Sequence, residues 1–173
     1  MKRRDFLRTA SLAAAGAAGF PTIVQASALG RAGRPAPSDR IVMAGVGLGM
    51  QGIPNMQNFL ENGDIQWVAV CDVDRGHLEK ARKIVDDRTG SRACAVYRDF
   101  RELFARRDLE AVSIAVPDHW HAIVALSAVR AGLDVYGEKP LTHGLREGRA
   151  LCDAVRRYGR VWQTGSWQRS VEN

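Results

Sequence analysis

The sequence is poor in residues that commonly hold metal ions. Its three cysteines, Cys71, Cys94 and Cys152, form no CxxC pair, and its four histidines form no HExxH motif. These absences argue against a metal site, so we predict none. Each cysteine falls in an apolar strand or helix pattern, which predicts three buried thiols.

The chain also lacks a large excess of charge of one sign. Its formal net charge is +6, but residues 1–28 contain four of the 25 Lys and Arg residues and one of the 19 Asp and Glu residues. The remaining residues therefore carry a net charge of only +3, without a run of five like charges. A surplus this small gives no reason to expect nucleic acid as a partner.

The first 28 residues have the pattern of an export signal. A charged start is followed by a weakly apolar stretch, too short and too mild to span a membrane, and then by Ala26 and Ala28 in a small-residue cleavage site. Arg3 and Arg4 resemble the twin-arginine signal of the bacterial Tat pathway. The alternative, a basic amphipathic arm, does not explain the cleavage site. We therefore predict a Tat signal peptide, the Tat translocase as a partner during export, and a periplasmic or otherwise exported location.

A glycine-rich turn follows the first apolar run after the signal. Gly47, Gly49 and Gly52 have the GxGxxG spacing, which permits a tight turn, close approach of the backbone to a pyrophosphate, and packing of the next helix on its strand. Glycines also gather in ordinary turns, but here an apolar run precedes the motif and apolar residues at helical spacing follow it. The free N–H groups of that helix favour an anionic ligand. The cofactor-binding candidates of this turn are Gly47, Gly49, Met50, Gln51 and Gly52.

A second apolar run, residues 65–71, ends at an acid 20 residues after the last of these glycines. Asp72 stands where dinucleotide-binding folds place the carboxylate that binds the adenosine ribose hydroxyls. A carboxylate at this place repels a 2′-phosphate, so the predicted cofactor is NAD rather than NADP. Either Asp72 or Asp74 can instead cap the next helix, and we assign the cap to Asp74. Arg75 could neutralise a phosphate, which keeps NADP open as the alternative.

Apolar runs alternate with helical patterns along the chain. The predicted strands are 41–43, 65–71, 94–100, 111–116, 133–137 and 160–165. In the helices at 122–132 and 145–158, the inward residues are expected to be Ala122, Ile123, Leu126 and Val129, and Leu151, Ala154, Val155 and Tyr158. This order predicts an α/β fold with a doubly wound parallel sheet, a Rossmann fold, over residues 40–173, after a flexible linker at 29–39.

Ligands of such sheets bind at the carboxyl ends of the strands, so the loops after the apolar runs carry the most information. These loops are PDHWH at 117–121, EKP at 138–140 and TGSWQRS at 164–170. Lys139, set between a carboxylate and a proline, can hold its ammonium at a fixed point, either to donate to a substrate hydroxyl or to carry a proton. The alternative is a surface ion pair with Glu138.

The histidines and tryptophans of these loops also have local alternatives. Asp118 can cap the helix that follows, so His119 and His121 could serve only as cap and packing residues. We expect cofactor contact for His121, while His119 and Trp120 stay open between pocket lining and packing. Aromatic and Arg side chains after the last strand suit a sugar and its hydroxyls. The substrate candidates there are Trp167, Gln168 and Arg169, whereas Trp162 has the spacing of a core residue.

Together these motifs resemble the glucose–fructose oxidoreductase, inositol dehydrogenase and rhizopine catabolism family, usually written Gfo/Idh/MocA. The matching stretches are GLGMQG at 47–52, CDVD at 71–74, PDHWHA at 117–122, AGLDVYGEKPLTH at 131–143 and the GSWQRS ending. The resemblance implies an NAD(P)-dependent oxidoreductase in which Lys139 hydrogen-bonds the hydroxyl being oxidised. It also implies that Glu138, Pro117 and His121 line the nicotinamide half of the site.

The family resemblance further implies a second α+β domain that supplies the substrate floor, and this domain is missing from the 173 residues. We therefore expect the chain to be the cofactor domain of a longer protein or a natural truncation, with its turnover alone left open. The implied reaction is hydride transfer between nicotinamide and a hydroxyl carbon of a sugar or polyol. The full-length protein is expected to be a homo-oligomer.

Three other functions are compatible with parts of the pattern. Some members of the family cleave glycosides by transient oxidation, so an NAD-dependent glycosidase is one alternative. A non-catalytic nucleotide-binding remnant is another. A methyltransferase also combines a glycine turn with an acid at a strand end, but the EKP motif speaks against it.

The export signal yields a direct prediction. In a bacterial host, the protein should reach the periplasm and be shortened after Ala28, because the cleavage site follows the apolar stretch. Replacing Arg3 and Arg4 together with Lys should retain it in the cytoplasm, since the pathway reads the arginine pair. Cell fractionation and mass spectrometry measure both effects. Unchanged export of the double variant would instead assign the signal to the general secretory route.

Overall fold

The computed structural model describes residues 35–166 and Arg169. The chain divides into two units, Met1–Ala36 and Pro37–Asn173, and the sheet and helices given below belong to the second. The predictions that fall outside the described residues concern the signal peptide at 1–28, the linker residues 29–34, and Trp167 and Gln168.

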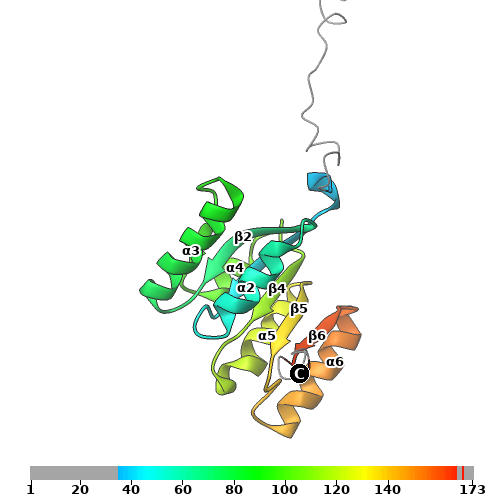
Figure 1. Cartoon of the computed structure of the whole chain (residues 1–173). Helices are drawn as coiled ribbons and strands as arrows, with labels where there is room; N and C mark the ends of the chain where they lie inside the picture. Colours follow the sequence, from blue (N-terminus) through cyan, green and yellow to red (C-terminus); the bar gives the residue numbers. More distant parts are fainter. Residues whose placement is uncertain (1–34, 167–168, 170–173) are drawn as a thin grey trace, which may run out of the picture. The chain divides into compact units, whose positions relative to one another are not determined.

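Six parallel strands form one sheet in the order β3-β2-β1-β4-β5-β6 (Figure 1). Their bounds are β1 Ile41–Val46, β2 Ile65–Cys71, β3 Ala95–Tyr97, β4 Ala111–Ile114, β5 Asp134–Glu138 and β6 Trp162–Gly165. The strand order reverses at β1, because β2 pairs with one of its edges and β4 with the other. Such a reversal creates a crevice at the carboxyl ends of the strands on either side of it. The predicted doubly wound sheet is confirmed.

Helices connect the successive strands. They are α2 (Gly52–Glu61), α3 (Arg75–Thr89), α4 (Phe100–Phe104), α5 (His121–Arg130) and α6 (Leu145–Tyr158), with short 3-10 turns η2 (Pro37–Asp39) and η3 (Asp118–Trp120). Residues of α2 and α3 share one buried apolar cluster with β1 and β2, whereas residues of α4, α5 and α6 share another with β1, β2, β4 and β5. The sheet is therefore covered on both faces, as parallel sheets are.

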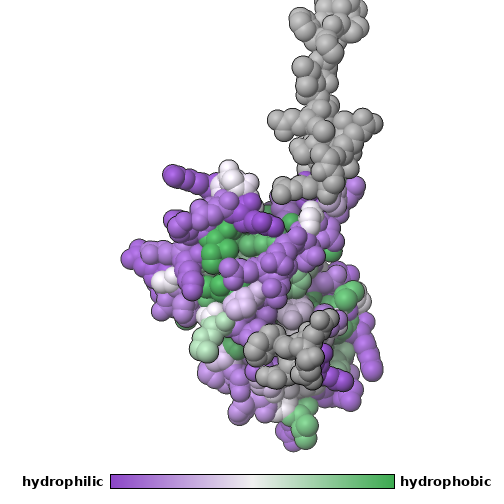
Figure 2. All heavy atoms as spheres, viewed as in Figure 1, coloured by the Kyte–Doolittle hydropathy of each residue, from purple (hydrophilic) through white to green (hydrophobic). Residues whose placement is uncertain are grey.

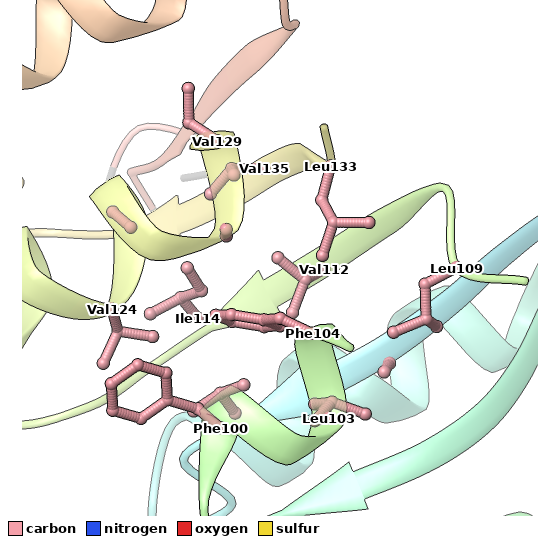
Figure 3. Packing of buried hydrophobic residues seen from close by; sticks show 14 of the residues in the cluster. Phe100, Leu103, Phe104, Leu109, Val112, Ile114, Val124, Val129, Leu133 and Val135 are labelled. Carbon is pink, nitrogen blue, oxygen red and sulfur yellow. The ribbon is translucent and has the colours of Figure 1, made fainter. Parts of the chain in front are cut away.

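The larger cluster is packed around the middle of the sheet. Side chains of α4 and α5 point toward those of β4 and β5 (Figure 3), and Leu103, Val112 and Ile114 are fully buried. The rings of Phe100 and Phe104 lie 5.7 Å apart between centroids. Burying side chains of this size contributes about 1.5–3 kcal/mol each, so this cluster holds β4 and β5 beside β1 and thereby fixes where their carboxyl ends lie.

Three inward predictions for helical residues are wrong. Ile123 is 47% exposed and Tyr158 is 42% exposed, and the Cys152 thiol lies on the exposed side of α6. Helix α5 is apolar nearly all round, so its periodicity does not single out one face. The face of α5 that packs on the sheet contains Ala125 and Ala128, whose small side chains let the helix approach closely. Of the other two cysteines, Cys71 is buried and Cys94 is half-buried.

The surface is mostly hydrophilic, with separate apolar patches on the face that Figure 2 shows. Leu145, at the start of α6, and Val161, before β6, are the most exposed apolar residues near the β6 edge. None of the helices within the described residues has the length and apolar character needed to cross a membrane.

Candidate functional site

The three glycines of the turn after β1 serve different purposes. Gly47 has a φ of +80°, and a Cβ there would lie 2.3 Å from the Ala115 carbonyl oxygen. A Cβ on Gly52 would lie 1.9 Å from the Gly47 oxygen, so both positions require glycine for the turn to close. Among the described residues, a Cβ on Gly49 would meet only the His77 ring, at 3.5 Å, which is an ordinary contact. The chain thus leaves the space at Gly49 open, as a turn that receives a pyrophosphate must.

Asp72 joins this turn to the end of β2. Its Oδ2 accepts a hydrogen bond from the Leu48 N–H at 2.6 Å, and the Gly47 N–H donates to the Cys71 carbonyl at 2.9 Å. Its Oδ1 accepts from the Asp74 N–H at 2.9 Å, and its side chain is 9% exposed. A carboxylate has about four acceptor positions, so Asp72 keeps positions for hydroxyl donors in addition to these.

Asp74 caps α3, as predicted. Its side chain accepts from the His77 N–H at 2.9 Å, and that hydrogen bond is the main reason why the pKa of Asp74 is lowered. The His77 ring was not anticipated as part of the site. Its Nδ1 lies 3.4 Å from Asp72 Oδ2, and its Cε1 would lie 3.5 Å from a Cβ on Gly49. The sequence carries no signal for this residue, because its place depends on where α3 begins.

The loop after β4 is mostly exposed. Pro117, His119 and Trp120 all lie at the surface, and the rings of His119 and Trp120 are 6.2 Å apart between centroids. The Pro117 carbonyl accepts from the Trp120 N–H at 2.8 Å, which closes η3. These three candidates are therefore accessible beside the crevice, and their roles remain predictions.

His121 is the buried residue of this loop, with 2% of its surface exposed at the start of α5. Burial lowers the pKa of His121, and a hydrogen bond to the Val116 backbone and the charge of Asp118 oppose that shift. The charges of Glu138 and Lys139 also act on this imidazole. The loops after β4 and β5 are thus within electrostatic reach of each other, as their adjacent strands require.

At the end of β5, Glu138 is 3% exposed and is held by α2. Asn55 donates from Nδ2 to Glu138 Oε1 at 3.0 Å, and the Lys139 backbone N–H donates to Oε2 at 3.2 Å. Gln51 in turn donates to Asn55 Oδ1 at 3.0 Å, so a chain of hydrogen bonds connects the glycine turn with the EKP loop. Asn55 was missed by the sequence analysis. A lone polar residue in the first turns of a helix gave too weak a signal.

The Lys139 side chain is exposed. None of the ion pairs among residues 35–166 joins it to Glu138, so the surface ion pair considered as its alternative role is absent there. The catalytic role of Lys139 remains a prediction, and none of the ion pairs among residues 35–166 gives its ammonium a carboxylate partner.

Two further candidates, Met50 and Arg169, are exposed. Met50 is 97% exposed at the tip of the glycine turn. Arg169 is exposed after β6, where its backbone N–H donates to the Ser166 carbonyl at 2.7 Å. None of the ion pairs or cation–π contacts within the described part of the chain includes Arg169.

Two surface hollows lie outside the crevice. One, of about 610 Å³, lies between α3 and β3 and is lined by Arg75, Leu78, Glu79, Arg82, Val96 and Arg98. The other, of about 570 Å³, lies beside α6 and β6 and is largely apolar. The chemistry of the crevice rests on the glycine turn, Asp72 and Glu138. In the described residues, no group of three His, Cys, Asp or Glu side chains could hold a metal ion.

Known proteins resemble this chain in sequence. Residues 40–166 match the profile of a family described as an oxidoreductase family with an NAD-binding Rossmann fold. A glycosyl hydrolase family 109 protein of Shewanella sp. strain MR-4 is 28% identical over 169 residues, covering 90% of this chain and 37% of its own length. An alpha-N-acetylgalactosaminidase of Shewanella oneidensis is 27% identical over the same length and coverage.

The fold also matches solved structures. The scyllo-inositol dehydrogenase of Lactobacillus casei, determined with bound NAD(H) and scyllo-inositol, superposes with a TM-score of 0.68 and 24% identity over 77% of this chain and 38% of that one. At this identity the match establishes the fold. The chain spans little more than a third of the length of these relatives.

The buried His121 predicts a pH-dependent stability. Because its pKa is lowered in the folded state, the unfolded state binds more protons below about pH 6.5, and the free energy of unfolding should fall as the pH drops from 6.5. The slope from one such group is at most about 1.4 kcal/mol per pH unit. Urea unfolding at several pH values should show this slope shrink in His121→Gln and persist in His119→Gln, whose side chain is exposed. If both variants keep the full slope, another group is responsible.

Proposed function

The chain belongs to the Gfo/Idh/MocA oxidoreductase family, and we propose on this basis that it binds NAD in the crevice at the β1 turn as the cofactor domain of an exported sugar or polyol dehydrogenase. The observation that carries the proposal is the contrast among the three glycines. A Cβ on Gly47 or Gly52 would collide with backbone atoms, so the fold requires glycine at both positions. A Cβ on Gly49 would meet only the His77 ring, at 3.5 Å. A glycine that the fold itself does not need is expected where a ligand approaches the backbone closely.

The position of Asp72 supports NAD over NADP in this proposal. The carboxylate lies at the end of β2, next to the turn that would hold the pyrophosphate, and it retains acceptor positions for the two ribose hydroxyls. A 2′-phosphate would place its negative charge against that carboxylate. The Arg75 side chain is 91% exposed and pairs with Glu79 at 3.7 Å, so it would have to leave Glu79 to neutralise such a phosphate.

Bound NAD would supply the hydride acceptor, and residues at the ends of β4 and β5 would act on the substrate side. Lys139 would donate from its ammonium to the hydroxyl being oxidised, a contact that strengthens as the oxygen gains negative charge. Its exposed position beside His121 and its freedom from Glu138 support that role.

A second candidate is an NAD-dependent glycosidase, which the names of the two Shewanella relatives favour. A dehydrogenase releases one NADH for each substrate oxidised. A glycosidase that oxidises its sugar transiently returns the hydride, so it releases the aglycone with no net NADH. Measuring NADH and released aglycone together, with the full-length protein that the gene encodes, separates a dehydrogenase from a glycosidase.

The main test of the proposal compares substitutions at Gly49 with a substitution at Gly52. Gly49→Val should abolish detectable NADH binding to the 173-residue chain, because its side chain fills the space meant for the pyrophosphate. Gly49→Ala should unfold in urea like the wild type, since its Cβ makes only an ordinary contact. Gly52→Ala is the matched control, and it should lose stability because its Cβ meets the Gly47 oxygen at 1.9 Å. NADH titration by fluorescence and urea unfolding measure these effects. Full NADH binding by a folded Gly49→Val variant would refute the assignment of the site.

The role of Lys139 gives a prediction for the longest product of the gene. Lys139→Met should leave the Kd for NAD nearly unchanged and lower kcat by on the order of 10² to 10³, the usual effect of losing one such donor. The control, Lys80→Met, removes an exposed charge from α3 and should change neither value. Steady-state kinetics on the best sugar or polyol found provides the measurement. Near-normal kcat in a destabilised Lys139→Met variant would make the lysine a structural residue.

A further inference from the structure

Glu138, at the end of β5, is the one acidic residue that is buried among the described residues. Glu138 is 3% exposed and Asn55 is 6% exposed, yet both are polar. A buried carboxylate is costly unless donors or a cation compensate it. Each Glu138 oxygen accepts one N–H hydrogen bond, from Asn55 and from the Lys139 backbone. No ion pair among the described residues includes Glu138, so its compensation comes from donors alone.

Neighbouring residues are shaped to hold this acid. A Cβ on Gly165, at the end of β6, would lie 2.5 Å from Glu138 Oε1, so only glycine leaves room for the carboxylate. Gln51 orients Asn55 by donating to its Oδ1, which leaves the Asn55 Nδ2 to face Glu138. The negative charge of Glu138 also contributes to the raised pKa of Tyr136, after burial. The acid is therefore fixed in place from α2, β5 and β6.

The strand order places this acid on one side of the crevice. Asp72 assigns the adenosine half to β2, and β5 lies beyond β4 on the opposite side of β1. In a doubly wound sheet the second half of a dinucleotide lies on that opposite side. The nicotinamide half of a bound cofactor would therefore lie near the end of β5. The nicotinamide ring carries a positive charge only in its oxidised form.

We propose that Asn55 positions Glu138 as a fixed negative charge for the nicotinamide half of the crevice, and that this charge biases the chain toward NAD⁺ over NADH. The proposal rests on the proposed function, because it requires the dinucleotide to bind at the β1 turn. Glu138 acts here on the charge of the ring, and Asn55 acts only through Glu138.

The other charges near this place differ from Glu138 in exposure. Lys139 and Asp118 are exposed, so water screens them, and buried His121 has a lowered pKa that keeps it neutral at neutral pH. A unit charge in a partly buried place of this kind changes the ratio of the affinities for a charged and an uncharged ring on the order of tenfold. Glu138 is therefore the charge expected to decide the preference.

The test compares the ratio of the Kd for NADH to the Kd for NAD⁺ in variants of the 173-residue chain. Glu138→Gln keeps the shape of the side chain but removes its charge, so the ratio should fall on the order of tenfold. Glu138→Asp keeps the charge and should hold the ratio near the wild-type value, even if both affinities weaken. Glu61→Gln, which removes an exposed acid at the opposite end of α2, is the matched control and should leave the ratio unchanged.

Asn55→Ala provides a second route if Glu138→Gln does not fold, as circular dichroism would reveal. It removes the donor but keeps the acid, and the ratio should move in the same direction by a smaller factor. An unchanged ratio in folded Glu138→Gln or Asn55→Ala, with both nucleotides bound, would overturn this proposal and leave the proposed function intact. A wild-type chain that binds neither nucleotide would instead overturn the proposed function.

Discussion

The hydrogen bond from the Leu48 N–H to Asp72 Oδ2, at 2.6 Å, joins the two halves of the signal that the sequence carries. It ties the glycine turn after β1 to the acid at the end of β2, and the backbone hydrogen bond from Gly47 to Cys71 reinforces it. Because β1 is the strand at which the order of the sheet reverses, this junction sits at the head of the crevice. The remaining site residues acquire their positions relative to it.

A second junction extends the crevice to the other side of β1. Helix α2 begins at the glycine turn, and Asn55 in its second turn reaches Glu138 at the end of β5. The first junction lies where the adenosine half of a dinucleotide would bind, and the second lies where the nicotinamide half would bind. A single helix thus connects the residues that would receive the pyrophosphate with those that would face the reacting ring.

The sequence predicted the main part of this architecture, since apolar periodicity and strand-end residues reflect burial directly. The parallel sheet, the glycine turn, Asp72 at the end of β2 and the Asp74 cap were all found in this way. Periodicity failed for α5, because a helix that is apolar nearly all round has no preferred face until the sheet selects Ala125 and Ala128. Asn55 and His77 were missed because their roles arise from contacts between segments distant in sequence, which no local pattern records.

Calorimetric titration of the 173-residue chain with NAD⁺ and with NADP⁺ tests whether the β1 turn and Asp72 form a site for NAD. The Asp72→Asn variant is titrated in parallel, because Asn can still accept from the Leu48 N–H while losing the negative charge. We expect the wild type to bind NAD⁺ more tightly than NADP⁺, and we expect the ratio of the two affinities to be smaller in the variant. Equal or tighter binding of NADP⁺ by the wild type would contradict this expectation.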